Sequence, residues 1–394
     1  MIVGIPRESY PGERRVALVP AAIPNLAKAG LQVLIEAGAG ESAGYPDHEY
    51  AEKGAKIAAS RADVFAQAEI ITQVLAHGSN DKTGNADLPL LRRGQILVGF
   101  LRPLNTLETL NEIAATGVTS FSVELMPRTT RAQSMDALSS MATICGYKAV
   151  IMAADTLPRI FPMLTTAAGT ITPGRVLIIG AGVAGLQAIA TARRLGAVAS
   201  AYDMRPAAKE QVQSLGGRFV ELAIAAKDAQ DARGYATAQD EEFYSKQREL
   251  LGDAVAGNDV VISAAVIPGK KSPVLVTKEM VARMAPGSVI VDLAAERGGN
   301  CELTRGGETV VEHGVTIIGA FNLASAVPYH ASQMYAKNVS AFLLNLVKDG
   351  KVQINEADEI HRETLVTRDG EIVNARVREF AGLPPLAAQP KVTS

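Results

Sequence analysis

The sequence contains two cysteines and no tryptophan in 394 residues, and only five histidines. Cys145 and Cys301 lie far apart without a CxxC spacing, which argues against a disulfide framework and favours a reducing cytoplasm. His77 precedes a Gly-Ser-Asn turn and is expected to be exposed in a loop, and the other histidines show no metal-ligand spacing. No metal site is predicted.

The sequence also has no large excess of positive or negative charge and no long apolar run. The formal net charge is −2, so no overall positive field exists to hold nucleic acid. Arg7 and Glu8 stand where a signal peptide needs an apolar run. The most apolar stretch, 176–192, is interrupted by glycines and is short of the about 20 residues of a membrane-spanning helix. We therefore expect no nucleic-acid partner, no secretion and no membrane span.

The sequence has a globular composition arranged in alternating segments. Hydrophobic residues make up 47% and charged residues 20%, and the length suits two domains. In the first third, helical segments such as 106–115 separate strand-like runs at 2–5, 32–36, 69–75, 95–101 and 118–123. This alternation is typical of a parallel sheet covered by helices on both faces.

A second alternating series begins after residue 174. Strands are predicted at 175–179, 197–203, 259–265 and 288–293, with helices at 184–195 and 277–284, and a last helix at 331–347. The predicted fold class is therefore α/β, with two doubly wound parallel-sheet domains of Rossmann-like type and a cleft between them.

The segment Gly180-Ala181-Gly182-Val183-Ala184-Gly185 forms a GxGxxG pattern between a predicted strand and a predicted helix. The first glycine allows a tight turn, the second lets a pyrophosphate approach the backbone, and the third allows close packing of the helix on the strand. The N–H groups of Val183 and Ala184 at the helix start can hold the anion. The segment predicts a dinucleotide site.

Asp203 ends the next predicted strand, where a carboxylate can bind both hydroxyls of an adenosine ribose and repel a 2′-phosphate. NAD(H) is therefore favoured over NADP(H). Met204 and Arg205 follow directly and are assigned to the same site. An arginine at such a place can also bind a 2′-phosphate, so Arg205 keeps the NADP(H) alternative open.

Several strings of the sequence resemble one known family. They are GIPRE, PGERRVALVP, ELMPRTTRAQSMDALSS, RVLIIGAGVAGLQAIATARRLGA, YDMR, KEQVQSLGGRF, AAVIPGKKSPVL and VDLAAERGGN. Over residues 1 to about 370, the chain resembles the alanine dehydrogenase/transhydrogenase family, and within it the NAD(H)-binding component of proton-translocating transhydrogenases.

The resemblance implies a discontinuous N-terminal domain, 1–138 plus 326–380, and an NAD(H)-binding domain, 139–325, joined by a long helix. Residues 381–394 would be a flexible tail. Gly234 and Tyr235 would form the tip of a mobile loop that closes over the nucleotide, with Tyr235 as its contact. Ala265, at the end of a predicted strand, should border the nicotinamide, because ligands bind outside the carboxyl ends of parallel strands.

The resemblance also implies that the loop PRTTRAQSMD reaches NAD(H) from the first domain. Arg128, Gln133 and Asp136 would lie by the nicotinamide as the catalytic group, with Ser139 nearby. The Gln133 amide can pair with the nicotinamide carboxamide, and an Arg128–Asp136 pair can hold the loop. The residues alone leave a plainer alternative, a polar helix entry with Ser134 as the N-cap.

Alanine dehydrogenase is the competing interpretation within the same family. Reductive amination needs proton transfers as well as hydride transfer. Gln73, Arg102 and Glu296 stand where that enzyme carries Lys, His and Asp, so all three proton-handling positions differ. Arg15, which would hold a substrate carboxylate there, is kept, either for that role or for structure alone.

Hydride transfer between two nicotinamides needs no side-chain acid or base, only two carbons held close together in a dry site. The resemblance implies that NADH bound here passes hydride to NADP⁺ on a separate NADP(H)-binding component, while a membrane-spanning component couples the reaction to proton translocation. It also implies a homodimer peripheral to the inner face of the cytoplasmic membrane. A non-enzymatic NAD(H) sensor is the third interpretation.

Overall fold

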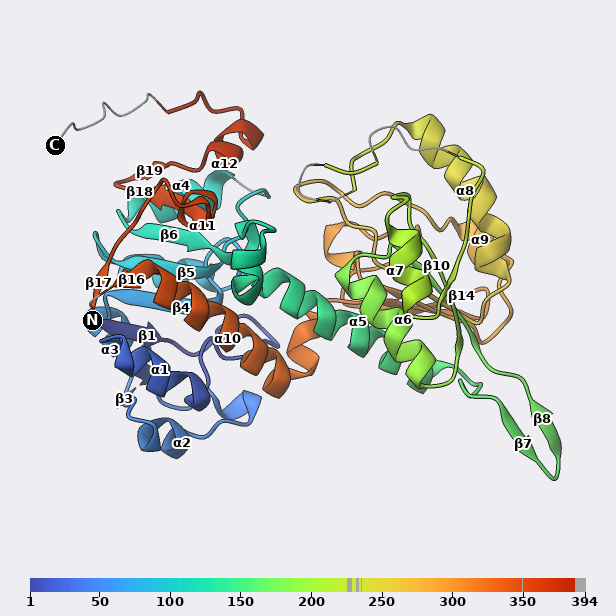
Figure 1. Ribbon diagram of the computed structural model, residues 1–394, viewed down its shortest axis with the longest axis horizontal. Helices are drawn as coiled ribbons and strands as arrows, with labels where there is room; N and C mark the ends of the chain where they lie inside the picture. The colour runs from blue at the N-terminus through green and yellow to red at the C-terminus, as the bar shows by residue number, and fades with distance from the viewer. Residues whose placement is uncertain (106, 225–228, 232–233, 235, 349, 387–394) are drawn as a thin grey trace. The chain divides into compact units, whose positions relative to one another are not determined.

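A computed structural model describes residues 1–105, 107–224, 229–231, 234, 236–348 and 350–386. The chain forms two compact units (Figure 1). Unit 1 comprises Met1–Met141 together with the chain from Val327 onward, and unit 2 comprises Ala142–Ala326. Both units are built on a mainly parallel sheet, as the sequence predicts.

Unit 1 contains an eight-stranded sheet in the order β3-β2-β1-β4-β5-β6-β18-β19. Its strands are β1 (Ile2–Ile5), β2 (Gln32–Glu36), β3 (Lys56–Ala58), β4 (Ile70–Leu75), β5 (Ile96–Phe100), β6 (Thr119–Ser122), β18 (Leu365–Arg368) and β19 (Glu371–Ile372). The first six run parallel, and the strand order reverses between β1 and β4. β18 pairs antiparallel with β6, so the C-terminal segment extends this sheet.

The helices of unit 1 cover the sheet with apolar faces. They are α1 (Ile23–Lys28), α2 (Asp47–Glu52), α3 (Arg61–Gln67), α4 (Leu107–Ala115), α10 (Pro328–Leu346), α11 (Glu359–Thr364) and α12 (Ala375–Phe380). α4 buries Leu110, Ile113 and Ala114, which confirms the predicted helical spacing. α10 begins at Pro328, ahead of the predicted start, because proline fits the first turn of a helix.

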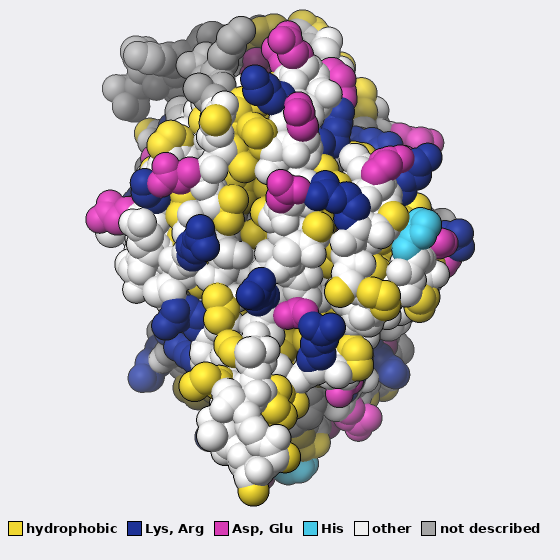
Figure 2. All heavy atoms as spheres, turned by 90° about the vertical axis from the view of Figure 1, so that its right-hand side faces the viewer, with side chains coloured by type: hydrophobic (Ala, Val, Ile, Leu, Met, Phe, Trp, Pro, Cys, Tyr) yellow, Lys and Arg dark blue, Asp and Glu magenta, His cyan; other side chains and the backbone are white. Residues whose placement is uncertain are grey.

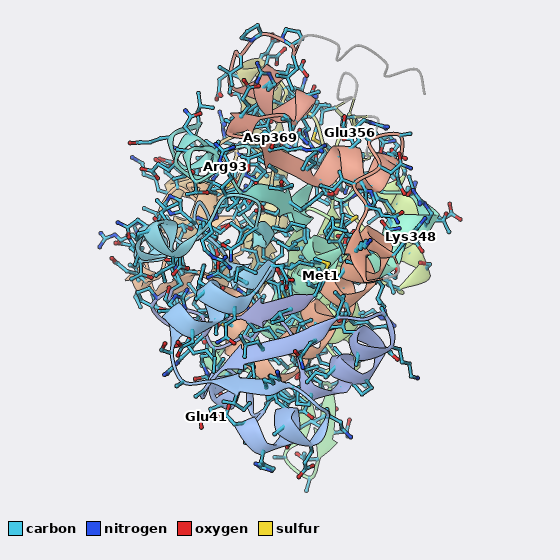
Figure 3. All side chains as sticks on the ribbon, turned by 90° about the vertical axis from the view of Figure 1, so that its left-hand side faces the viewer. Met1, Glu41, Arg93, Lys348, Glu356 and Asp369 are labelled. Atoms are coloured by element: carbon cyan, nitrogen blue, oxygen red, sulfur yellow. The ribbon has the colours of Figure 1, made fainter. Side chains whose placement is uncertain are left out.

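The C-terminal segment of unit 1 contains a small hairpin and two ion pairs made by Arg368. β16 (Val347–Lys348) and β17 (Lys351–Val352) form a hairpin after α10. Arg368 in β18 forms ion pairs with Glu356 at 3.0 Å and with Asp369 at 3.6 Å. Glu356 and Asp369 are both labelled in Figure 3. These contacts fasten the segment before α11 to the β18–β19 turn.

Unit 2 contains a seven-stranded sheet in the order β11-β10-β9-β12-β13-β15-β14. Its strands are β9 (Arg175–Ile179), β10 (Val198–Tyr202), β11 (Arg218–Phe219), β12 (Val260–Ser263), β13 (Val289–Asp292), β14 (Thr309–Glu312) and β15 (Val315–Gly319). All pairs are parallel except β14 with β15. The strand order reverses between β9 and β12, which is where doubly wound sheets bind ligands.

Helices cover both faces of the unit 2 sheet (Figure 1). They are α5 (Ala137–Thr156), α6 (Val183–Arg194), α7 (Ala208–Ser214), α8 (Glu241–Ala256) and α9 (Lys278–Ala282). α5 begins in unit 1 and continues into unit 2. Among the described helices it alone is long and apolar enough to cross a membrane by length and composition. Its Ala149, Val150 and Ala153 are instead packed in the core of unit 2, as in a core helix of a globular protein.

A two-stranded hairpin, β7 (Leu164–Thr166) with β8 (Gly169–Ile171), projects from the rest of unit 2 (Figure 1). Every residue of both strands is exposed. Figure 2 shows the hairpin at the lower end of the view, with apolar side chains on its surface. Met163, Leu164 and Ile171 are 62%, 43% and 48% exposed.

Candidate functional site

The glycine turn of unit 2 begins at the point where the strand order reverses. Gly180 directly follows β9 and has a φ of +97°. A Cβ added there would lie 2.9 Å from both the Ala264 carbonyl carbon and the Ala265 amide nitrogen, just beyond β12. Glycine at 180 therefore satisfies both the left-handed backbone and the close approach of the neighbouring strand end.

The second and third glycines differ in their surroundings. A Cβ on Gly182 would meet nothing within 4 Å, so the space above this backbone is open. A Cβ on Gly185 would lie 1.9 Å from the Gly180 carbonyl oxygen, so only glycine lets α6 pack this closely on the turn. Both environments match the roles that a GxGxxG turn needs for a pyrophosphate.

The start of α6 supplies amide groups beside this open space. Gly182 is the N-cap and has no side chain, and Val183 and Ala184 form the first turn. The N–H groups of a first helical turn have no partner within the helix and favour an anion. A Cβ on Gly146 would lie 2.1 Å from the Ala184 carbonyl oxygen, so α5 supports the start of α6. The residues present fit a nucleotide pyrophosphate.

Asp203 connects the end of β10 to the glycine turn. Its Oδ2 accepts a hydrogen bond from the Ala181 N–H at 2.8 Å, and the residue is 8% exposed. Arg205 binds the same carboxylate through its backbone N–H, Nε and Nη2, at 2.7 to 2.9 Å. The hydrogen bonds to Asp203 raise the pKa of the Arg205 guanidinium above its usual value. The positive charge of Arg205 is therefore directed at Asp203.

Arg205 also contacts the loop that the family resemblance assigns to closure over the nucleotide. Its Nη1 donates to the Gly234 carbonyl oxygen at 2.8 Å. Met204 lies half-buried between the two paired residues. Tyr235 lies outside the residues that the structure describes. Unit 2 thus brings together the glycine turn, Asp203, Arg205, Gly234 and the backbone at Ala265.

The loop that carries Arg128, Gln133, Asp136 and Ser139 belongs to unit 1. It contains a 3-10 helix, η5 (Thr130–Met135), followed directly by α5. Asp136 accepts hydrogen bonds from the Ser139 N–H at 2.9 Å and the Ser139 hydroxyl at 2.6 Å. Asp136 therefore caps α5. The alternative of Ser134 as the N-cap is wrong, because Ser134 lies inside η5.

Two contacts from the C-terminal segment hold the η5 loop. Arg131 forms a two-pronged ion pair with Asp358 before α11, with Nη1 at 2.8 Å from Oδ2. Asn338 of α10 donates from Nδ2 to the Ser134 carbonyl oxygen at 2.8 Å. This pair joins the loop to a residue more than 200 positions away in the sequence. Sequence reasoning missed Asp358 because no local motif marks it.

Gln73 is part of a buried network rather than a free amide. Its Nε2 donates to Asp87 Oδ2 at 3.0 Å, and Arg61 binds the same carboxylate at 2.6 Å through each of two nitrogens. Gln73 is 2% exposed. An amide held in this way can neither accept nor release a proton at neutral pH.

The other two positions that distinguish the dehydrogenase also have structural partners. Arg102 adopts a φ of +48°, and its N–H donates to Glu124 Oε2 at 2.8 Å. Glu296 in unit 2 accepts a hydrogen bond from the Asn322 N–H at 2.8 Å. Arg15 is 4% exposed and forms a two-pronged pair with Glu13, at 2.8 and 2.6 Å.

The expectation that His77 is an exposed loop residue is wrong. His77 is 6% exposed, and its Nε2 lies 2.6 Å from Glu112 Oε2 on α4. Its partner Glu112 lies 35 residues later in the sequence, within the same unit. Among the described residues, no three His, Cys, Asp or Glu side chains are grouped to hold a metal ion.

Comparison with known proteins places this geometry in a family. The models "Alanine dehydrogenase/PNT, N-terminal domain" and "Alanine dehydrogenase/PNT, C-terminal domain" match residues 4–145 and 149–375. An NAD(P) transhydrogenase alpha subunit chain of Rhodospirillum rubrum is 46% identical over 377 residues, covering 95% of this chain and 98% of the relative. The alanine dehydrogenase of Bacillus subtilis is 29% identical over 400 residues, covering 99% and 97%.

Solved structures agree with these relatives. The crystal structure of transhydrogenase from Sinorhizobium meliloti has a TM-score of 0.82 and 41% identity, covering 95% of this chain and all of that one. An L-alanine dehydrogenase structure has a TM-score of 0.78 and 25% identity, covering 97% and 99%. The similarity confirms the predicted α/β fold with two Rossmann-like, parallel-sheet domains. The chain belongs to the alanine dehydrogenase/PNT family.

Proposed function

We propose that this chain is the NAD(H)-binding component of a proton-translocating NAD(P) transhydrogenase. The observation that carries the proposal is the Ala181–Asp203 hydrogen bond, which joins a ribose-binding carboxylate to a glycine turn where the sheet reverses its strand order. The relatives named as transhydrogenase alpha subunits, and the solved structure named as a transhydrogenase, support the same assignment.

The adenosine end of the site favours NAD(H). Asp203 provides the carboxylate that would accept hydrogen bonds from the ribose hydroxyls. Arg205 has its guanidinium paired with that carboxylate, so its charge is not free for a phosphate. The pyrophosphate would lie over Gly182 and take hydrogen bonds from the N–H groups of Val183 and Ala184. Gly234 and Tyr235 would close over the bound nucleotide.

At the nicotinamide end, the proposed residues are Arg128, Gln133 and Asp136, with Ser139 and the Ala265 backbone. Bound NADH supplies the hydride. These residues would orient the ring and exclude water rather than move a proton, because transfer between two nicotinamides needs only close approach. The cap that Asp136 forms with Ser139 supports this role, since it holds the end of the η5 loop in one conformation.

The proposed partners are an NADP(H)-binding component, a membrane-spanning component and a second copy of this chain. The β7–β8 hairpin supports the homodimer, because an isolated two-stranded hairpin with exposed apolar side chains is marginally stable in water. A location at the inner face of the cytoplasmic membrane follows from coupling to a membrane component.

Alanine dehydrogenase is the second candidate, favoured by the relatives that are 29% identical. The Gln73–Asp87–Arg61 network opposes it, because the position that would handle a proton is an amide bound to a charge-paired carboxylate. Arg15 is also neutralised by Glu13, which weakens its attraction for a substrate carboxylate.

The test is a pair of reactions run with the same purified chain. One measures hydride transfer from NADH to an NADP⁺ analogue after a transhydrogenase NADP(H)-binding component is added. The other measures NADH oxidation with pyruvate and ammonium alone. Transfer that requires the partner, without pyruvate reduction, is expected. Reductive amination of pyruvate by the chain alone overturns the proposal. If NADH binds and the partner docks but neither reaction occurs, the chain is better explained as a non-enzymatic NAD(H) sensor.

A further inference from the structure

The string VDLAAERGGN, which the nucleotide motif does not include, forms a second built turn in unit 2. Asp292 ends β13 and is completely buried. Gly298 and Gly299 have φ values of +93° and +80°, which bring the chain back over the Asp292 side chain. A Cβ on Gly299 would lie 2.8 Å from Asp292 Oδ2, so the turn needs glycine there.

The Asp292 carboxylate fixes this turn through five donors. Its Oδ1 accepts from the Ser263 hydroxyl and the Ala294 N–H, both at 2.9 Å. Its Oδ2 accepts from the Asn300 N–H at 2.7 Å, the Cys301 N–H at 3.0 Å and the Thr304 hydroxyl at 2.7 Å. The contact with Ser263 ties the end of β13 to the end of β12. Charge-assisted bonds of this kind are stronger than neutral ones.

Asn300 extends from this fixed turn to the neighbouring strand end. It is completely buried, and its Oδ1 accepts from the Ala265 N–H at 3.0 Å. Its Nδ2 donates to the carbonyl oxygens of Ala265 at 2.9 Å and Pro273 at 2.8 Å. One amide therefore binds both backbone polar groups of Ala265.

The segment that Asn300 holds lies against the glycine turn. The Ala264 N–H donates to the Ile179 carbonyl oxygen at 2.7 Å, directly before Gly180. Ala264 and Ala265 are thus fixed from β9 on one side and from Asn300 on the other. Ala265 lies at the carboxyl end of β12, where doubly wound sheets bind ligands, and the proposed function assigns it to the nicotinamide end of the site.

We propose that Asn300, held by Asp292, is a positioning residue that sets the Ala264–Ala265 backbone as the support for the nicotinamide end of NAD(H). The inference rests on the proposed function. It explains why a buried amide and a pair of glycines follow β13. A residue with this role affects the nicotinamide end of the nucleotide and leaves the adenosine end, bound at Asp203 and Gly182, largely unaffected.

The experiment compares ADP-ribose, which lacks the nicotinamide, with NADH on the full chain. In Asn300→Ala, three backbone groups, the N–H and carbonyl of Ala265 and the carbonyl of Pro273, lose their partner. We expect NADH affinity to fall about tenfold while ADP-ribose affinity changes less than about twofold. Partner-dependent transfer at saturating NADH should also fall. The control is Asn258→Ala, which removes a single amide contact to the Ala254 carbonyl oxygen before β12 begins.

Because each comparison is a ratio of two affinities on one variant, a moderate loss of folded protein does not affect it. Asn300→Ser is the second variant if Asn300→Ala fails to fold, and the same split is expected. Equal losses of ADP-ribose and NADH affinity, or no loss of either, overturn the inference. Failure of the unaltered chain to bind NADH overturns the proposed function itself, before any variant is compared.

Discussion

Asp203 and Arg205 form a two-pronged ion pair, with Arg205 Nε 2.9 Å from Oδ1 and Nη2 2.7 Å from Oδ2. Both side chains are largely buried, at 5% and 16% exposure. The same arginine donates to the Gly234 carbonyl oxygen. If the ribose hydroxyls bind Asp203 as proposed, they must share its carboxylate with Arg205 or displace the arginine. Either change would link the proposed nucleotide site to the loop at Gly234.

Replacing the charge of Asp203 tests the nucleotide preference. Asp203→Asn should weaken NADH binding by about tenfold, because the hydrogen bonds of a carboxylate to ribose are charge-assisted. Discrimination against NADPH should narrow, since the repulsion of its 2′-phosphate is lost and Arg205 is released. Fluorescence titration with both nucleotides measures the two affinities. Asp253→Asn, which breaks an exposed pair with Arg283, should change neither; an unchanged nucleotide ratio in Asp203→Asn would contradict the assignment.

Substitutions at the second and third glycines of the turn should have different effects, the first on nucleotide binding and the second on stability. Gly182 has a φ of −78° and open space around its position, so Gly182→Ala should fold normally but lose at least about tenfold in NADH affinity, as the methyl group occupies the space for the pyrophosphate. Gly185→Ala places its methyl 1.9 Å from the Gly180 oxygen and should lower the free energy of unfolding by about 1–3 kcal/mol. Thermal unfolding and NADH titration of each variant test this; the reverse pattern would refute the site geometry.

The Arg131–Asp358 pair should matter for transfer more than for stability. Arg131 is 57% exposed, so Arg131→Gln should cost less than about 1 kcal/mol in unfolding free energy. Loss of the pair frees the η5 loop, and partner-dependent hydride transfer should fall several-fold. Arg159→Gln is the matched control, because Arg159 is 56% exposed and binds Asp259 in unit 2. Equal transfer rates in the two variants would exclude a role for this anchor.

Glu8 should make the stability of unit 1 depend on pH. Burial and the nearby Glu13 raise the pKa of Glu8 from 4.5 to about 8, against hydrogen bonds from the N–H groups of Val74 and Leu75. The folded state therefore binds a proton on Glu8 more tightly than the unfolded state does. The contribution of this protonated Glu8 to stability is full below pH 4.5 and is lost as the pH rises to about 8.

Urea unfolding between pH 5 and pH 9 gives the free energy of unfolding at each pH. Comparison with a variant that lacks the Glu8 carboxyl group separates its effect from that of the other titrating groups. Glu8→Gln should show a weaker fall in stability with rising pH than the unaltered chain. Glu41→Gln, at an exposed position of the same unit, should keep the original slope. Identical slopes for Glu8→Gln and the unaltered chain would show that Glu8 does not titrate in this range.

Local patterns predicted the elements of the fold that depend on neighbouring residues. The strands β1, β2 and β9 have the predicted bounds, and the glycine turn lies between β9 and α6 as its spacing requires. β14 and β15 were not predicted, because a short turn with left-handed His313 and Gly314 interrupts the apolar pattern. Periodicity also cannot pair β18 with β6, where the Ser120 and Thr367 hydroxyls lie 2.7 Å apart.

In the candidate site, too, features within one local unit could be predicted, whereas contacts between distant segments could not. The position of Asp203 beside the glycine turn could be predicted from the sequence, because the motif and this residue belong to one βαβ unit. The wrong expectation for His77 came from its local turn, whereas the ring pairs with Glu112 on α4, 35 residues later in the sequence. Asp358 and Asn300 bind residues that are distant in the sequence, at 227 and 35 positions, so no local pattern could predict these contacts.

The most direct test of the central claim is a single-turnover measurement on the full chain loaded with NADH. Rapid mixing with an NADP(H)-binding component that carries an NADP⁺ analogue should oxidise the bound NADH, at most one per chain, and chain mixed with buffer should keep its NADH. Retention of NADH in the presence of a docked, loaded partner would contradict the account.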